Sequence, residues 1–232
     1  MSTEQLALVQ GWDDTRAALS RWRARPRTVL VPWTLGALAV AVLLLAATLV
    51  VAALSTPDPS GSVFPGISRP ATGGDLVYVL ERNGLVLALH ALACIAGFMA
   101  GSSLPQVAEG YSGWKRRLHD HAGPAAIVFV AGATLFSLGT QAYVLGGQAS
   151  TLAADLDLSV PELILGLLPH ALPELTALFL PLAAWTMASR SGAWKDLLAA
   201  TLVTVTIAVP VLVATAVVET AVTPRILRAL AG

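Results

Sequence analysis

The stretch VLVPWTLGALAVAVLLLAATLVVAAL occupies residues 29–54 and contains no charged side chain. Its length exceeds the ~20 residues that an α-helix needs to cross the hydrocarbon core of a bilayer. We therefore expect it to be a membrane span. Further apolar runs follow along the chain, at residues 83–104, 122–147, 161–189 and 197–223.

The composition of the whole chain agrees with this interpretation. Of its 232 residues, 56% are hydrophobic and 12% are charged, whereas soluble domains carry roughly 25% charged residues. The alternating segments of ~10 residues that are typical of a β-barrel are absent. The sequence predicts an all-α, polytopic transmembrane helical bundle of about five spans, with the lipid bilayer as a partner. The formal net charge is zero and suggests no nucleic-acid partner.

Residues 29–224 form the predicted transmembrane domain, with a segment on either side. Residues 1–28 place two leucines and two tryptophans near one helical face, with arginines around and after them. This pattern suits an amphipathic helix on an anionic cytoplasmic leaflet, and a solvated tail whose arginines set the topology is the alternative. The apolar run that follows is too long for a signal peptide. Residues 225–232 form a short C-terminal tail.

The distribution of lysine and arginine predicts the orientation in a cell membrane. With five spans, one side carries ten of these residues and the other side carries four. The side with ten holds residues 1–28 and the segments 105–121 and 190–196. The other side holds the segments 55–82 and 148–160 and the C-terminus. We therefore expect the N-terminus to be cytoplasmic and the C-terminus external.

The fourth apolar run contains the stretch PHALPEL at residues 169–175. A continuous helix kinked by its prolines would place His170 and Glu174 one turn apart on one face. Alternatively, the helix breaks at residues 170–172 and restarts with Pro173 in its first turn, where the missing N–H is tolerated. Of these two, the sequence analysis favours the Pro-broken fourth span.

Ionisable side chains at membrane depth usually face a bundle interior or a wet cavity and indicate function. His170, Glu174 and Glu219 are such residues. Counting ~1.5 Å per helical residue places them, together with His90 and Gln141, in the outer half of the bilayer. We predict that these five residues form a polar cluster. Gly97 and Gly101 form a small-xxx-small pattern, which is typical of helix packing.

Three interpretations of the cluster remain open. It can be a structural pair that locks the helices, a hydrated pocket for a solute, ion or proton, or a metal or hydrolytic site. The two histidines and two glutamates could bind zinc, but the local spacing is His-x₃-Glu and no HExxH motif is present. No catalytic triad, phosphate loop or nucleotide fingerprint is visible, so no cofactor is predicted.

Three motifs resemble those of the stage II sporulation protein M family. This membrane family is also known as a domain of unknown function. Arg82–Asn83–Gly84 resembles the Asn-containing entry to its second span. Residues 168–177, LPHALPELTA, resemble its His-Gly-x-x-Glu-Leu-x-Ala signature, with Ala171 in place of the usual glycine. Residues 218–224, VETAVTP, resemble its Glu-x-x-x-x-Pro ending.

The resemblance covers residues 75–224 and implies a multi-span protein of the bacterial cell membrane. The name-giving member is viewed as a membrane anchor for cell-wall-degrading partners, and no catalytic activity carries over residue by residue. We therefore expect a non-enzymatic component that organises other membrane proteins, or copies of itself in a homo-oligomer. The alternatives are a transporter or channel subunit and, third, an intramembrane metal-dependent hydrolase.

Overall fold

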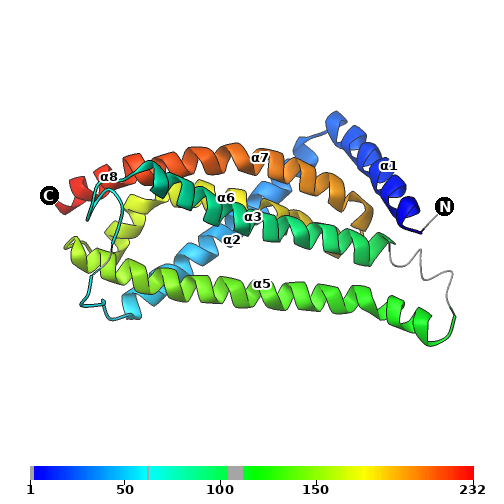
Figure 1. The fold of residues 1–232 in the computed structure, drawn as a ribbon, viewed down its shortest axis with the longest axis horizontal. Helices are drawn as coiled ribbons and strands as arrows, with labels where there is room; N and C mark the ends of the chain where they lie inside the picture. Colours follow the sequence, from blue (N-terminus) through cyan, green and yellow to red (C-terminus); the bar gives the residue numbers. More distant parts are fainter. Residues whose placement is uncertain (1–2, 62, 104–111) are drawn as a thin grey trace. The chain divides into compact units, whose positions relative to one another are not determined.

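The computed structural model describes residues 3–61, 63–103 and 112–232, and Figure 1 labels its helices. These residues form no β-strand beyond one isolated bridge between Pro65 and Arg69, so the predicted all-α class is confirmed. The elements are α1 (Thr3–Ala24), α2 (Arg27–Leu54), α3 (Gly73–Phe98), the π-helix η1 (Met99–Ser103), α5 (Trp114–Asp155), α6 (Val160–Ser191), the 3₁₀ turn η2 (Trp194–Asp196), α7 (Leu197–Val217), the π-helix η3 (Val218–Val222) and α8 (Thr223–Ala231).

Five helical stretches of the described chain are long and apolar enough to cross a membrane. The first, α2, begins two residues before the predicted span and ends at the predicted residue, Leu54. The others are Gly73–Ser102, Ile127–Asp155, Val160–Ser191 and Trp194–Ala231. Part of the predicted polar loop 105–121 lies outside the described residues, and its end from Trp114 onward belongs to α5.

The second span begins earlier than expected. The apolar run that predicts this span begins at residue 83, but residues 75–82 are the first turns of α3. The backbone N–H and the hydroxyl of Thr72 both donate to Oδ2 of Asp75, each at 2.8 Å. A side chain three residues into a helix that bonds back to the residue before it forms a capping box, which sets where a helix starts.

The fourth span is one continuous α-helix, so the Pro-broken version is wrong. α6 runs from Val160 to Ser191 through Pro169, Pro173 and Pro181. Ser159 and Glu162 form a capping box at its start, with 2.6 Å between Oγ and Oε2. Residues 177–185 are all buried. Packing on this scale overrides the local preference of proline to break a helix.

The fifth span also continues further than predicted. The apolar run that predicts this span ends at residue 223, but α7 passes through η3 into α8, and Pro224 lies in the first turn of α8. Proline is favoured there because its missing N–H has no partner in a first turn. The π-turn of η3 accommodates the change, as single π-turns do within longer helices.

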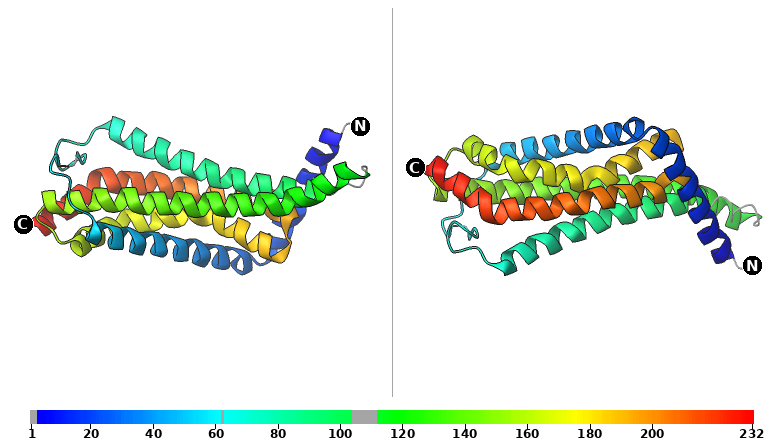
Figure 2. Two further views of the ribbon diagram at one scale, coloured as in Figure 1. Left: turned by 90° about the horizontal axis from the view of Figure 1, so that it is seen from below. Right: turned by 90° about the horizontal axis from the view of Figure 1, so that it is seen from above.

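The described residues group into two compact units. The first unit draws on residues 1–37, 87–134 and 179–207. Figure 2 shows α1 beside the turn between α6 and α7, where Arg21 donates to Asp196 at 2.6 Å. The rings of Trp22 and Trp33 meet edge to face, with centroids 5.2 Å apart. α1 is therefore fixed to this unit at two points.

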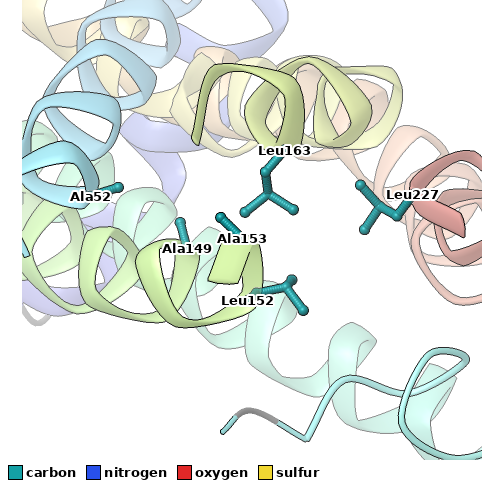
Figure 3. Close-up of a cluster of buried hydrophobic side chains, with 6 residues drawn as sticks. All are labelled: Ala52, Ala149, Leu152, Ala153, Leu163 and Leu227. Carbon is teal, nitrogen blue, oxygen red and sulfur yellow. The ribbon is translucent and has the colours of Figure 1, made fainter. Parts of the chain in front are cut away.

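The second unit comprises residues 38–86, 135–178 and 208–232. Side chains from α2, α5, α6 and α8 meet in its hydrophobic core (Figure 3). Leu163 and Leu227 are fully buried there and lie beside small residues of α2 and α5. The core residues are Ala52, Ala149, Leu152, Ala153, Leu163 and Leu227. The alanines let the helices approach closely, as is common in membrane bundles.

Candidate functional site

The candidate site lies in the second unit, where α6 meets the end of the fifth span. His170 of α6 is 7% exposed, and Thr223, the first residue of α8, is fully buried. Nδ1 of His170 lies 2.8 Å from Oγ1 of Thr223, and the two are hydrogen-bonded. A buried polar group needs such a partner, because its desolvation is otherwise uncompensated. This bond joins the fourth span to the fifth.

Glu174 lies one helical turn after His170. Its carboxyl group faces the amide of Asn83 and the hydroxyl of Thr215, and it interacts electrostatically with Arg82 and Glu219. Asn83 is 4% exposed. In the described part of the chain, neither Oε2 of Glu174 nor Nδ2 of Asn83 has a hydrogen-bond partner.

Glu219 lies in the π-turn η3, four residues before Thr223. It interacts with Glu174 and with the guanidinium of Arg82. π-turns within α-helices are frequent at functional sites. Three elements far apart in the sequence therefore supply the charged groups: α3 supplies Arg82, α6 supplies Glu174 and η3 supplies Glu219.

The other two predicted cluster residues are His90 and Gln141. His90 belongs to the first unit, where its ring centroid lies 5.6 Å from that of Phe179. Gln141 belongs to the second unit, but its Nε2 donates to Oγ of Ser137 on its own helix at 3.0 Å. Depth along a helix put these residues level with the glutamates, but it carries no information on the direction in which each helix faces.

Gly97 and Gly101 lie in the first unit at close helix contacts. A Cβ atom on Gly97 would lie 2.8 Å from side-chain atoms of Leu197 and Trp185. A Cβ atom on Gly101 would overlap the side chain of Trp194. Real Cβ atoms do not approach neighbours so closely, so both positions are suited to a residue without a side chain.

Four residues of the site were absent from the sequence-based candidates: Arg82, Asn83, Thr215 and Thr223. Arg82 and Asn83 entered the sequence analysis only through the Arg82–Asn83–Gly84 motif, and their position at the start of an apolar run is a signal that could have added them to the cluster. The threonines give no such signal, because the fifth span contains many and most bond to a carbonyl of their own helix.

The arrangement limits what the site can bind. Among the described residues, no three His, Cys, Asp or Glu side chains come together as a metal-binding group. The predicted zinc ligand set of two histidines and two glutamates is therefore not assembled there. The site instead offers two carboxyl groups, a buried amide and a hydroxyl beside one arginine.

The helices and this buried polar cluster define a helical membrane protein. Residues 117–224 match the family model described as Stage II sporulation protein M. The match includes His170, Glu174 and Glu219 and ends at Pro224, so the resemblance predicted from the motifs is confirmed over this stretch. No curated protein and no solved structure matches the chain significantly.

Proposed function

We propose that this protein is a non-enzymatic component of the bacterial cell membrane that organises or anchors other membrane proteins. It spans the membrane five times, with its N-terminus in the cytoplasm. The polar cluster of the second unit then serves the architecture of the bundle, and the partner binds elsewhere. The proposal rests on one observation about the third span.

The third span packs much less than the others. In α5, only 6% of the span's most apolar window is buried, compared with 28% in α2 and 44% in α6. Large side chains project from it, with Phe136 78% exposed and Tyr143 73% exposed. The last turns of α5 supply Ala149, Leu152 and Ala153 to the core of the second unit. Its apolar window has few contacts, so the surface of that window is available to a partner helix.

The polarity of this span favours a protein partner over lipid alone. Gln141 and Ser137 bond to each other along α5, and Ser137 is exposed. An amide carries two donors and one acceptor with two lone pairs, so one bond leaves most of this capacity unused. Side chains of this kind hydrogen-bond across helices in membrane bundles. We infer that a transmembrane helix of another membrane protein covers this face.

Photo-crosslinking in native membranes tests the proposal. A photoreactive amino acid is introduced at Phe136 or Tyr143, and Leu43 of α2 serves as the control because it is 69% exposed on another span. We expect a discrete membrane-protein adduct from the α5 positions and lipid adducts from Leu43. Gln141→Leu should weaken the protein adduct while leaving the amount of folded protein unchanged.

Three results would reject the proposal: lipid adducts alone from both α5 positions, the same protein adducts from Leu43, or no effect of Gln141→Leu. An adduct at twice the mass of the chain would identify the partner as a second copy. An adduct with a different protein would identify it as another membrane component.

A further inference from the structure

A groove lies in the first unit, in the angle where α1 meets α2. Figure 2 shows α1 bending away from α2, and residues 25–26 separate the two helices. The groove has a volume of about 210 Å³. Its apolar walls include Leu19 and Trp22 of α1, Val29 and Leu30 of α2, and Val203 of α7. Among the described residues that line it, Arg23 alone is charged.

Contacts beside the groove hold its walls in place. Arg21 donates to Asp196 at 2.6 Å, which fixes the end of α1 to the turn before α7. The ring of Trp22 meets the ring of Trp33 edge to face, with centroids 5.2 Å apart. A ligand that enters the groove therefore meets preformed walls, which lowers the cost of binding.

The groove lies near the ends of two membrane spans. Val29 and Leu30 belong to the first turn of α2. Val203 lies six residues after Leu197, the first residue of α7, which is ~9 Å along the helix axis. At this level of a bilayer the lipid headgroups meet the acyl chains. The apolar walls and the arginine are thus placed where both parts of a phospholipid are present.

The charge beside the groove is positive and unpaired. Arg23, Arg25 and Arg27 are exposed, and none of them makes an ion pair with a residue that the structure describes. Arg21 differs from them, because Asp196 neutralises it. Clusters of arginine at a membrane surface attract anionic lipids.

These observations together select one kind of ligand. An apolar hollow without an occupant loses dispersion contacts along its walls, and an acyl chain restores them. The guanidinium of Arg23 matches the geometry of a phosphate group. We propose that the groove binds one anionic phospholipid, with an acyl chain between α1, α2 and α7 and the phosphate at Arg23.

The first experiment compares two lipids on the wild-type protein. The full chain is purified in a neutral detergent, stripped of lipid and given phosphatidylglycerol or phosphatidylcholine with identical acyl chains. Native mass spectrometry counts the bound lipids and yields a Kd for each. We expect one phosphatidylglycerol per chain, with a Kd at least about fivefold lower than that of phosphatidylcholine, because one arginine near a membrane surface contributes this factor. Inorganic phosphate should not displace the lipid.

Two pairs of variants locate the bound lipid. Arg23→Gln should raise the Kd for phosphatidylglycerol about fivefold. Arg190→Gln removes the same charge from an exposed position of α6 outside the groove and should leave the Kd unchanged. Val203→Phe fills part of the groove and should weaken the binding of both lipids. Val213→Phe makes the same change at a position of α7 that is 47% exposed, and it should weaken neither.

Equal Kd values for the two lipids in the wild-type protein would overturn the proposal, and this comparison needs no variant. Equal effects of Arg23→Gln and Arg190→Gln would overturn it too, as would lipid binding that Val203→Phe leaves intact. Displacement by inorganic phosphate would show that the site binds the phosphate alone, against the proposal. A dimer that Val203→Phe dissociates would assign the groove to a second copy of the chain instead.

The groove is separate from the surface proposed for a partner helix. Its described lining residues come from α1, α2, α7 and the bend after α1, and none belongs to α5. A negative result here therefore leaves the crosslinking outcome unaffected, and the converse also holds.

Discussion

Oγ1 of Thr223 lies 2.8 Å from Nδ1 of His170, and both side chains are buried. The cluster predicted from the sequence contained two carboxyl groups, those of Glu174 and Glu219, that could have served as the partner of this histidine. An uncharged hydroxyl is the partner instead, and Glu174 interacts electrostatically with Glu219 and Arg82. His170 and Glu174 are one turn apart on α6, yet the hydrogen bond of His170 is to Thr223, the first residue of α8.

Replacing Thr223 with valine should destabilise the protein. The substitution keeps the shape of the side chain but leaves Nδ1 of His170 buried without its partner, which costs about 1–3 kcal/mol of unfolding free energy. Thr223→Ser should restore most of this loss. The matched control is Thr206→Val, because the hydroxyl of Thr206 is exposed and bonds within its own helix. Equal unfolding free energies for the two valine variants, measured in detergent, would contradict this role for Thr223.

A methyl group on Gly166 should disturb the docking of α8. A Cβ atom there would lie 2.6 Å from Cδ2 of Leu227, which is fully buried in the core of the second unit. Gly166→Ala should therefore lower stability, even though alanine is favoured over glycine within a helix by about 1 kcal/mol. Gly139→Ala on α5 meets no atom within 4 Å and should be neutral or stabilising. Limited proteolysis near the C-terminus checks this, and equal cleavage of the two variants would contradict it.

Two glycines of α3 allow the same comparison between a closely packed position and an open one. Gly97→Ala should destabilise the first unit by about 1–3 kcal/mol, because overpacking forces Leu197 and Trp185 to move. Gly84→Ala on the same helix meets no atom within 4 Å and should have little or opposite effect. Thermal unfolding of both variants in one detergent is the measurement. A Gly97→Ala variant as stable as Gly84→Ala would show that the contact at Gly97 relaxes without loss.

Reporter fusions at the two ends test the proposed topology. Five spans place the termini on opposite sides, and the excess of lysine and arginine predicts a cytoplasmic N-terminus. A fluorescent reporter that folds in the cytoplasm should be active at the N-terminus. A periplasmic phosphatase should be active at the C-terminus. Activity of the same reporter at both ends would reject five crossings.

Local composition determined where the first membrane span lies and which ionisable residues stand out within the spans. The first span begins within two residues of its predicted start, because a bilayer requires a long uncharged run and the sequence contains one. His170, Glu174 and Glu219 stood out for the same reason, since ionisable groups are rare at membrane depth. These features depend on the chemistry of each segment alone, so they can be predicted without knowing which segments pack together.

Only the tertiary structure decided how the segments meet. The prolines of α6 predicted a break at residues 170–172, but the helix is continuous there, with His170 buried in the bundle. The sequence does not encode the rotation of one helix against another in any local pattern. For this reason the sequence did not predict the hydrogen bond between His170 and Thr223. A hydrogen-bond partner is chosen by the direction and distance between side chains, and packing sets both.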